Sequence, residues 1–374
     1  MRKFSLDNKI FADILKHQAV HMDQAVCYCP EYLATRDMCY YPSRVAQIIR
    51  AVWLGELEPS QFGADLVFSS LLSGLGERWQ NFGESPNGYL FSQILGRELF
   101  LKHGFYREDA DKLLETIASQ GDHILPIDAH ERQLWQEAIP VEEDSNICLF
   151  VDDATYAFCS SSAIHLGDFL NSLDIQVHED IGPYFGGFEY FAMGLVDKGI
   201  AHFQKLIDQL EEKGIRRVIT LTGQSHFLLT TLCEAVGISH ELEIINILEL
   251  ATEITASKAY LYGGSFYTRF LGMSDLLNEL TENQEEKPIH NSCEFLPFVE
   301  GDKRVNTVTM WGMPVCSEFI LGTGDDKLLS SIGAMAVTDI KKAGGKEIIV
   351  CDPHAYVKLH KLGNTVQYYL DYLR

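Results

Sequence analysis

The stretch Ile147-Cys148-Leu149-Phe150-Val151 is an unbroken apolar run that follows a polar, turn-rich segment at residues 140–146. A strand of a parallel sheet is covered on both faces, so its sequence is continuously apolar rather than alternating. Downstream of this run, the pattern predicts a helix at 163–173, a strand at 175–177, a helix at 192–213 and a strand at 217–221. Strands that alternate with helices indicate β-α-β units, so an α/β fold is predicted from residue 147 onward.

The same order of elements recurs in the last third of the chain. The predicted elements there are a strand at 259–262, helices at 273–280 and 327–343, and a strand at 347–350. The helix text of 166–173 is echoed at 271–280, and the turn at 213–219 is echoed at 344–349. We therefore expect two tandem Rossmann-like α/β repeats, at 147–255 and 256–374, with an acidic, loop-rich insertion at 281–310 in the second.

Residues 1–140 lack an alternating strand pattern and are expected to form a helical N-terminal domain. Apolar positions recur at helical spacing in 42–55, 89–104 and 108–117. Pro42 suits the first turn of a helix, and Gly55 suits its end. The polar segment 140–146 is the predicted boundary between this domain and the first repeat.

The charge and cysteine counts exclude several function classes. The 374 residues include 30 Lys and Arg against 53 Asp and Glu, a net charge of −23, which opposes nucleic-acid binding and docking to anionic membranes. No apolar run approaches the ~20 residues of a membrane-spanning helix, and the N-terminus lacks the apolar core of a signal peptide. Nine cysteines, an odd number, argue against a disulfide framework. The sequence thus predicts a cytoplasmic protein with free or metal-binding thiols.

Two loops of the first repeat follow predicted strands and carry polar side chains. Ligands of open α/β sheets bind at the carboxyl ends of strands. Asp152 and Asp153 could hold a cation or act as acid and base there, or could simply cap the next helix. The turn 222–226 could present backbone N–H groups to an anion, or Ser225 could be only a helix N-cap. A small-molecule enzyme that uses Asp152, Asp153 and His226 is one hypothesis.

The second repeat carries a candidate metal site. Cys351 and His354 form a Cys-x-x-His pair after the strand at 347–350, a spacing suited to zinc or an iron–sulfur centre. Cys316 lies in a loop that faces the same expected crevice, and Cys293 or His290 from the insertion could supply a fourth ligand. The alternative is that the cysteines are core residues and His354 caps a helix.

Two further cysteines, Cys148 and Cys233, lie inside an apolar strand and an apolar helix. They are predicted to be core residues rather than ligands.

The loops of both repeats resemble the cysteine-rich domain found in the larger iron–sulfur component of heterodisulfide reductase, a family that also includes glycolate oxidase and lactate-utilisation iron–sulfur proteins. Residues 220–225 and 349–354 look like the family's two Cys-Pro-x-Cys positions. Residues 182–186 and 314–317 look like its two Cys-Cys-Gly positions, and 262–265 looks like a His-Asp-Pro-Cys stretch.

The N-terminal domain resembles the helical two-cluster ferredoxin component of the same reductase. Cys29-Pro30 falls where a cluster motif ends, and 41–50 fits the helix after it. The other cysteines of the two motifs are replaced, in the first by Ala19, Met22 and Ala25 and in the second by Ser69, Leu72, Leu75 and Trp79. Because such clusters need four thiolates, the sequence looks like a fusion of the ferredoxin-type and cysteine-rich-type components that has lost most of its cluster ligands.

This resemblance implies a helical ferredoxin-like domain followed by two α/β repeats, working beside other subunits of a redox complex. One reading is a metal-binding subunit in which Cys316, Cys351, His354 and Cys293 hold one zinc ion or an atypical iron–sulfur centre. The other is a non-catalytic scaffold or regulatory subunit without a cofactor. The sequence favours the metal-binding subunit, because Cys351 and His354 lie at the strand end where the family has its ligands, and the scaffold is the alternative.

Overall fold

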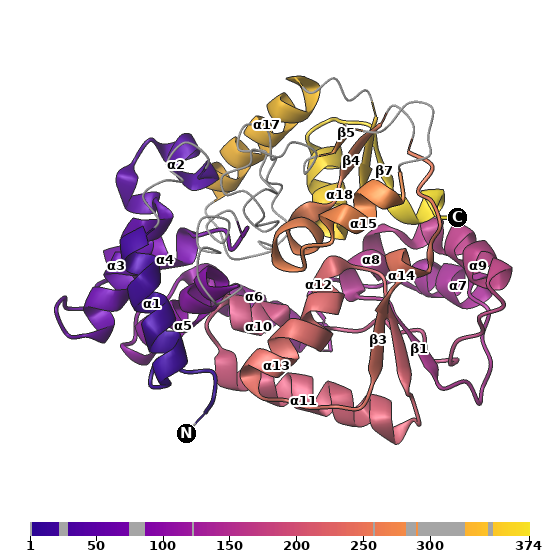
Figure 1. Ribbon diagram of the computed structural model, residues 1–374, viewed down its shortest axis with the longest axis horizontal. Coiled ribbons are helices and arrows are strands. Elements are labelled where there is room, and N and C mark those ends of the chain that lie inside the picture. The colour runs from indigo at the N-terminus through magenta and orange to yellow at the C-terminus, as the bar shows by residue number, and fades with distance from the viewer. Residues whose placement is uncertain are drawn as a thin grey trace.

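The structure is a computed structural model of the chain and has a mixed α/β architecture (Figure 1). It describes residues 2–21, 29–74, 87–121, 123–256, 259–281, 289–290, 326–342 and 347–374. Within this part of the chain, every helix is too short or too polar to cross a lipid bilayer.

The N-terminal region is helical, as predicted. Its helices are α1 (Lys9–His21), α2 (Pro30–Thr35), α3 (Pro42–Trp53), α4 (Gln61–Ser69), α5 (Gly88–Lys102), α6 (Glu108–Ser119) and α7 (Ala129–Ala138), with a short 3₁₀ turn η2 at Met38–Tyr40. The helices predicted at 42–55, 89–104 and 108–117 correspond to α3, α5 and α6 and are confirmed. Val45, Ile49 and Val52 of α3 lie in the core because they recur on one helical face.

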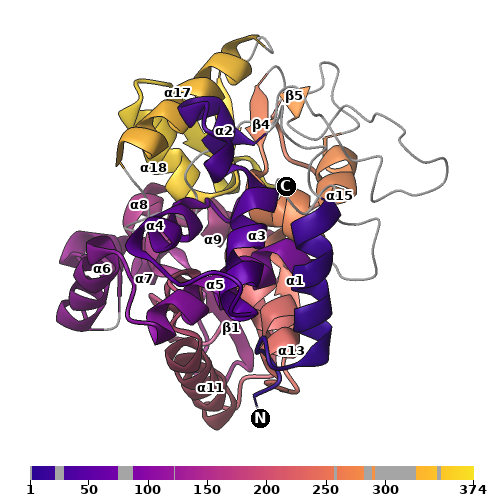
Figure 2. The same ribbon diagram turned by 90° about the vertical axis from the view of Figure 1, so that its left-hand side faces the viewer.

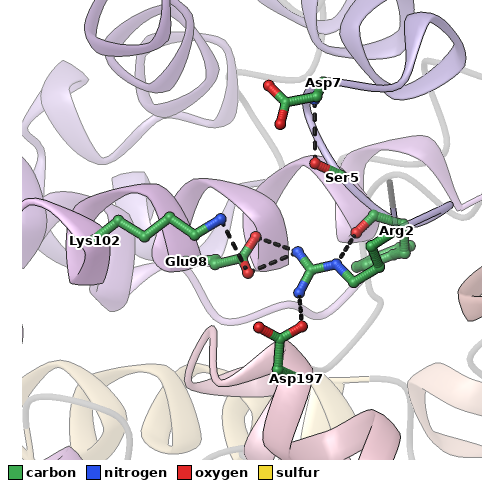
Figure 3. Close-up of polar contacts among 7 residues, drawn as sticks. Arg2, Ser5, Asp7, Glu98, Lys102 and Asp197 are labelled. Carbon is green, nitrogen blue, oxygen red and sulfur yellow. Dashed lines mark hydrogen bonds and ion pairs between the residues drawn. The ribbon is translucent and has the colours of Figure 1, made fainter.

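Two arginines join the helical region to the first α/β repeat. The Nη2 of Arg2 donates to both carboxylate oxygens of Glu98 in α5, at 2.5 and 2.6 Å, and its Nη1 contacts Asp197 of the next repeat (Figure 3). Arg97 is only 1% exposed, and its guanidinium donates to backbone carbonyls that include those of Ser70 and Ala192. A buried guanidinium requires such partners, so this contact fixes α5 against the repeat.

The first repeat contains a three-stranded parallel sheet in the order β1-β2-β3. Its elements are β1 (Ile147–Phe150), α8 (Asp153–Phe158), α9 (Ala163–Ser172), α10 (Phe188–Ala192), α11 (Val196–Glu212), β2 (Arg217–Thr220), α12 (Gly223–Phe227), the π-helix η5 (Leu228–Leu232), α13 (Cys233–Val236), β3 (Glu243–Asn246) and α14 (Ile247–Leu250), with a 3₁₀ turn η4 at Ser160–Ser162. The helix predicted at 192–213 is confirmed as α11 but begins later, because Gly194 adopts φ +77° and separates it from α10.

The second repeat contains a parallel sheet in the order β5-β4-β6-β7. Its described elements are β4 (Tyr260–Tyr262), the π-helix η6 (Phe266–Phe270), α15 (Ser274–Glu279), β5 (Ile289–His290), α17 (Asp326–Lys342), β6 (Ile348–Val350), α18 (Pro353–Lys361), β7 (Val366–Tyr368) and the 3₁₀ turn η7 (Tyr369–Tyr372). Figure 2 shows α17 beside α2, so the helical region contacts this repeat as well as the first.

The strands predicted at 147–151, 217–221, 259–262 and 347–350 are confirmed as β1, β2, β4 and β6. The strand predicted at 175–177 is wrong. Only Val177 pairs there, in an isolated bridge to Val141, so the segment forms no ladder. The ferredoxin-like and Rossmann-like assignments and the domain boundaries remain predictions.

The first sheet is the middle layer of the molecule. Along β1, Cys148 and Phe150 belong to the core that includes helices α1, α3, α4 and α5, whereas Leu149 belongs to a second core shared with the other sheet. Val218 and Ile219 of β2 divide in the same way. Both faces of the sheet are therefore buried, which explains the unbroken apolar runs of its strands.

Candidate functional site

The carboxyl ends of the two sheets meet, and tyrosines join them. The carbonyl of Leu221, the residue after β2, accepts hydrogen bonds from the hydroxyls of Tyr369 and Tyr267, the latter at 3.4 Å. The Tyr267 hydroxyl also lies 3.2 Å from the amide oxygen of Asn246 at the end of β3. In Figure 1, β4 and β7 accordingly lie above β1 and β3. The strand ends, where an open α/β sheet binds ligands, here hydrogen-bond to each other.

The two repeats also approach closely at the start of α12. A Cβ on Gly223 would lie 2.8 Å from the Cβ of Phe266 and 2.9 Å from the backbone nitrogen of Tyr267. Only a glycine allows this approach without displacing η6. The hydroxyls of Thr155 in α8 and Tyr368 in β7 lie 3.3 Å apart. The contact between the two sheets therefore extends from the segment after β2 to the helix after β1.

Three carboxyl groups gather beside this contact. Asp152 and Asp153 follow β1, and Glu189 begins α10. The Asp153 carboxylate is 4% exposed and accepts a 3.0 Å hydrogen bond from the backbone nitrogen of Ile124. Glu189 is half-buried and accepts a 3.5 Å contact from the side-chain amide of Gln224. The loop that carries Glu189 is held to β1 because Asp153 donates its backbone N–H to the carbonyl of Tyr184 at 3.1 Å.

Burial favours the neutral form of all three carboxyl groups. It raises the pKa of Glu189 to about 7, helped by the nearby charge of Asp152 and opposed by hydrogen bonds from its own backbone N–H and from Gln224. Burial also raises the pKa of Asp153 well above its usual value, and the carboxylate of Glu189 raises it further. Burial raises the pKa of Asp152 too, although hydrogen bonds from Thr155 and Thr222 oppose the shift. Burial thus shifts all three carboxyl groups toward the protonated form relative to free carboxylic acids.

The predicted helix caps can now be assigned. Asp152 caps α8 by accepting from the backbone nitrogen of Thr155 at 3.0 Å, as one of the two interpretations of this residue predicted. The prediction that Ser225 is an N-cap is wrong. Thr222 caps α12 and accepts from the backbone N–H of Ser225 at 3.1 Å, because Ser225 already lies in the first helical turn.

His226 belongs to a different polar network from the carboxyl cluster. Its Nδ1 lies 3.3 Å from the hydroxyl of Thr220, which also accepts from the side-chain amide of Asn246 at 3.2 Å. Burial lowers the pKa of His226, and Glu249 partly opposes the shift. Within the described ranges no hydrogen bond joins His226 to Asp152 or Asp153, and the small-molecule enzyme stays a hypothesis.

Cys351 and His354 follow β6, as predicted. Cys351 is 1% exposed, and burial with the neighbouring Asp352 carboxylate raises the pKa of its thiol. Burial lowers the pKa of His354 to about 4, and its Nδ1 is a buried atom with no hydrogen-bond partner in the described part of the chain. Asp352, not His354, caps α18, by accepting from the backbone N–H of Ala355 at 2.8 Å.

The other predicted metal ligands cannot be placed beside this pair. Cys316 and Cys293 lie outside the described residues, and of His290 the structure describes only its backbone position in β5. Among the residues that are described, no group of three His, Cys, Asp or Glu side chains could hold a metal ion. Cys351 and His354 fit as two ligands of a site, because a neutral imidazole and a cysteine thiolate are both zinc ligands, but they do not complete one.

Three of the other described cysteines have structural surroundings. Cys148 and Cys233 are 1% and 2% exposed, which confirms them as core residues. Cys29, at the end of the ferredoxin-like motif, caps α2: its sulfur accepts from the backbone nitrogen of Tyr32 and contacts Glu31 at 3.1 Å. Burial and the Glu31 carboxylate raise the pKa of the Cys29 thiol well above its usual value, so the thiol is held protonated.

Sequence reasoning missed Glu189 and the tyrosines of the inter-sheet contact. Glu189 directly follows the glycine- and aromatic-rich loop 182–188, whose composition indicates packing without a polar centre. A carboxylate among so many aromatic residues is a signal that could have marked it. The tyrosine contacts join residues 148 and 46 positions apart, and no local pattern predicts such pairing.

Comparison with known proteins identifies no relative: no family model matches the chain, and no curated protein matches it significantly.

Proposed function

We propose that this chain is a non-catalytic scaffold or regulatory subunit of a heterodisulfide reductase-like redox complex. The observation that carries the proposal is the closed contact at Leu221, where tyrosines of the second repeat hydrogen-bond to the strand end of the first. In the resemblance drawn from sequence, this strand end is the place of a cluster-binding loop. Here Thr222 and Ser225 replace the thiols, and they bond to each other at 2.9 Å.

The surroundings of the retained thiols support the same proposal. A cluster or a zinc ion binds the thiolate, so a ligand cysteine generally has a lowered pKa or a nearby positive charge. Cys29 and Cys351 instead have the carboxyl groups of Glu31 and Asp352 as charged neighbours. Acidic neighbours are compatible with buried protonated thiols that contribute packing.

A second candidate, a metal-binding subunit, is favoured by one specific observation. The Nδ1 of His354 is buried without a hydrogen-bond partner among the described residues, and its imidazole is neutral because burial lowers its pKa to about 4. A neutral ring nitrogen one helical turn from a cysteine is a suitable zinc ligand. In this alternative, Cys316 and Cys293 would complete the site with Cys351 and His354. The metal would convert the Cys351 thiol to a thiolate, and it would hold α18 to the loops.

The metal content of anaerobically purified protein separates the two candidates. Zinc, iron and acid-labile sulfide are measured on the natural chain, on Cys351→Ser/His354→Ala and on Cys233→Ser, a control that removes a buried cysteine elsewhere. The scaffold proposal expects no stoichiometric metal in any of the three proteins. About one metal per chain that is lost only from the double variant would overturn it and establish the metal-binding alternative.

The tyrosine contact gives the scaffold proposal a second, positive test. Tyr267→Phe/Tyr369→Phe leaves the buried carbonyl of Leu221 without either donor, and an unsatisfied buried acceptor costs about 1–3 kcal/mol. We expect the free energy of unfolding to fall by that amount, with faster amide exchange in both β2 and β6. Unchanged stability and exchange would show that the contact does not hold the two repeats together.

A further inference from the structure

The helical region presents a group of large apolar side chains where α3 joins α4. Leu54 and Leu57 lie in the connection and are 41% and 48% exposed, and Phe62 in the first turn of α4 is 66% exposed. Tyr106 is 45% exposed and lies next to them, because its carbonyl accepts from the side chain of Gln61 at 2.9 Å. We call these four residues, Leu54, Leu57, Phe62 and Tyr106, the α3–α4 patch; Figure 2 shows the two helices side by side.

The patch is held in place by the backbone. The N–H groups of Glu56 and Leu57 both donate to the carbonyl of Ala51, at 2.8 and 3.1 Å. The hydroxyl of Ser60 accepts from Gly63 and caps α4. Since α4 buries its other face through Ala64, Leu66 and Val67, Phe62 is directed away from the core. The backbone thus holds these exposed apolar side chains in place.

The size of the exposed area favours an interaction site. The exposed fractions of the four side chains amount to about two whole side chains, so at ~200 Å² each the area is on the order of 400 Å². Apolar patches of a few hundred Å² on a folded chain are often functional. The area matches one face of a short amphipathic helix rather than a whole standard interface, which buries ~800 Å² per partner.

The negative charges around the patch favour a basic partner. Glu56 is neutralised by Arg50 at 3.1 Å, but the carboxylates of Glu58 and Asp65 are exposed beside the apolar side chains. The whole chain carries a net charge of −23, so a second copy would be repelled. A segment with lysine or arginine on the edges of an apolar face is both attracted and able to cover the patch.

We propose that the α3–α4 patch is the docking surface for a basic amphipathic helix of a partner protein. This inference rests on the proposed scaffold function and names the surface through which the subunit would hold its complex. The apolar face of the helix covers Leu54, Leu57, Phe62 and Tyr106, and its basic residues pair with Glu58 and Asp65.

Binding of a probe peptide tests this assignment. The probe is a fluorescein-labelled peptide of about 18 residues with leucine on one helical face and lysine on the other, beside a scrambled peptide of the same composition. Fluorescence anisotropy at physiological salt measures the Kd for the natural chain and for Leu57→Gln/Phe62→Gln. The control is Ile164→Gln/Leu173→Gln, which replaces two apolar residues exposed to 56% and 39% on the first repeat.

We expect the amphipathic peptide to bind the natural and control chains equally, and the Leu57→Gln/Phe62→Gln variant about tenfold more weakly or worse. Glu58→Gln/Asp65→Asn should weaken binding and reduce its salt dependence. Equal binding of all variants, or equal binding of the scrambled peptide, would overturn the inference by showing attraction to net charge alone. A dimer in sedimentation equilibrium that Leu57→Gln/Phe62→Gln abolishes would overturn it in favour of self-association.

Peptide binding tests the docking surface, whereas the metal content tests the scaffold proposal. Failure of the peptide to distinguish the variants refutes the docking surface and leaves the scaffold proposal in place. Stoichiometric metal at Cys351 and His354 refutes the scaffold proposal whatever the peptide does.

Discussion

Replacing Glu189 by glutamine should stabilise the protein at neutral and alkaline pH but not at acid pH. Burial raises the pKa of this carboxyl group from 4.5 to about 7, and the neighbouring charge of Asp152 adds to the effect. The folded state therefore binds the proton more tightly than the unfolded state. As the pH rises from about 4.5 to about 7, the folded chain loses stability, because it must hold an ionised carboxylate in a site that favours the neutral acid.

The magnitude follows from the size of the shift. One pKa unit corresponds to ~1.4 kcal/mol, so a change from 4.5 to about 7 sets an upper limit of ~3 kcal/mol. Glu189 is only half-buried, so solvent screening reduces this limit, and we expect about 1–3 kcal/mol. The side-chain oxygen of glutamine still accepts the contact from Gln224, so the neutral substitute keeps the geometry.

Urea unfolding of the natural chain and of Glu189→Gln at pH 4.5, 6, 7 and 8 measures the effect. The difference in the free energy of unfolding should be near zero at the lowest pH and should grow to its full value by pH 8. Glu212→Gln, which replaces an exposed glutamate of α11, is the matched control and should differ from the natural chain by less than about 0.5 kcal/mol. A difference for Glu189→Gln that is the same at pH 4.5 and pH 8 would refute the reasoning.

Three further substitutions probe the packing that positions the site. Arg97→Met should cost about 3–5 kcal/mol in urea unfolding, because it leaves the backbone carbonyls that the buried guanidinium binds unsatisfied; a loss below ~1 kcal/mol would contradict this. Gly167→Ala should cost more than ~2 kcal/mol, since its Cβ would overlap a backbone carbonyl of α7; unchanged thermal stability would show that the helices can separate. A double-mutant cycle of Arg2→Ala with Glu98→Ala should give a coupling of about 1–2 kcal/mol, and the cycle with the more exposed Lys102 should give less than ~0.5 kcal/mol.

The strands that could be predicted are those buried on both faces, whether or not they lie at a sheet edge. β1, β2, β4 and β6 are short apolar runs, although β1 is an edge strand of its sheet. β3 begins with the exposed Glu243, and β7 has Gln367 at its centre, so neither sequence differs from that of a loop. Both are edge strands whose side chains are only partly buried, and this relaxes the requirement for apolar residues. The strand prediction for 175–177 is wrong for the opposite reason. Its residues suit a strand, but only Val177 pairs with another segment.

The candidate site could be predicted only where it depends on strand ends. Asp152, Asp153, Cys351 and His354 are identifiable because they follow apolar strands, and their positions are confirmed. Which side chains face them depends on contacts between distant segments, such as those of Glu189 with Asp153 and of Tyr369 with Leu221. Such contacts follow from how the two sheets pack, which the order of residues along one strand does not specify.

The acidic residues at the strand ends support the scaffold proposal independently of the missing cysteines. A cluster held by four thiolates is itself anionic, so binding it in a chain of net charge −23 requires local positive charge or N–H donors at the site. The loops after β1 and β6 instead place Asp152, Asp153 and Asp352 there, and the charge of Glu189 adds to burial in raising the pKa of Asp153. Once cluster ligands are absent, tyrosine hydroxyls can satisfy the strand-end carbonyls without adding charge. The contacts at Leu221 thus stabilise the same surfaces on which an anionic cluster would be electrostatically unfavourable.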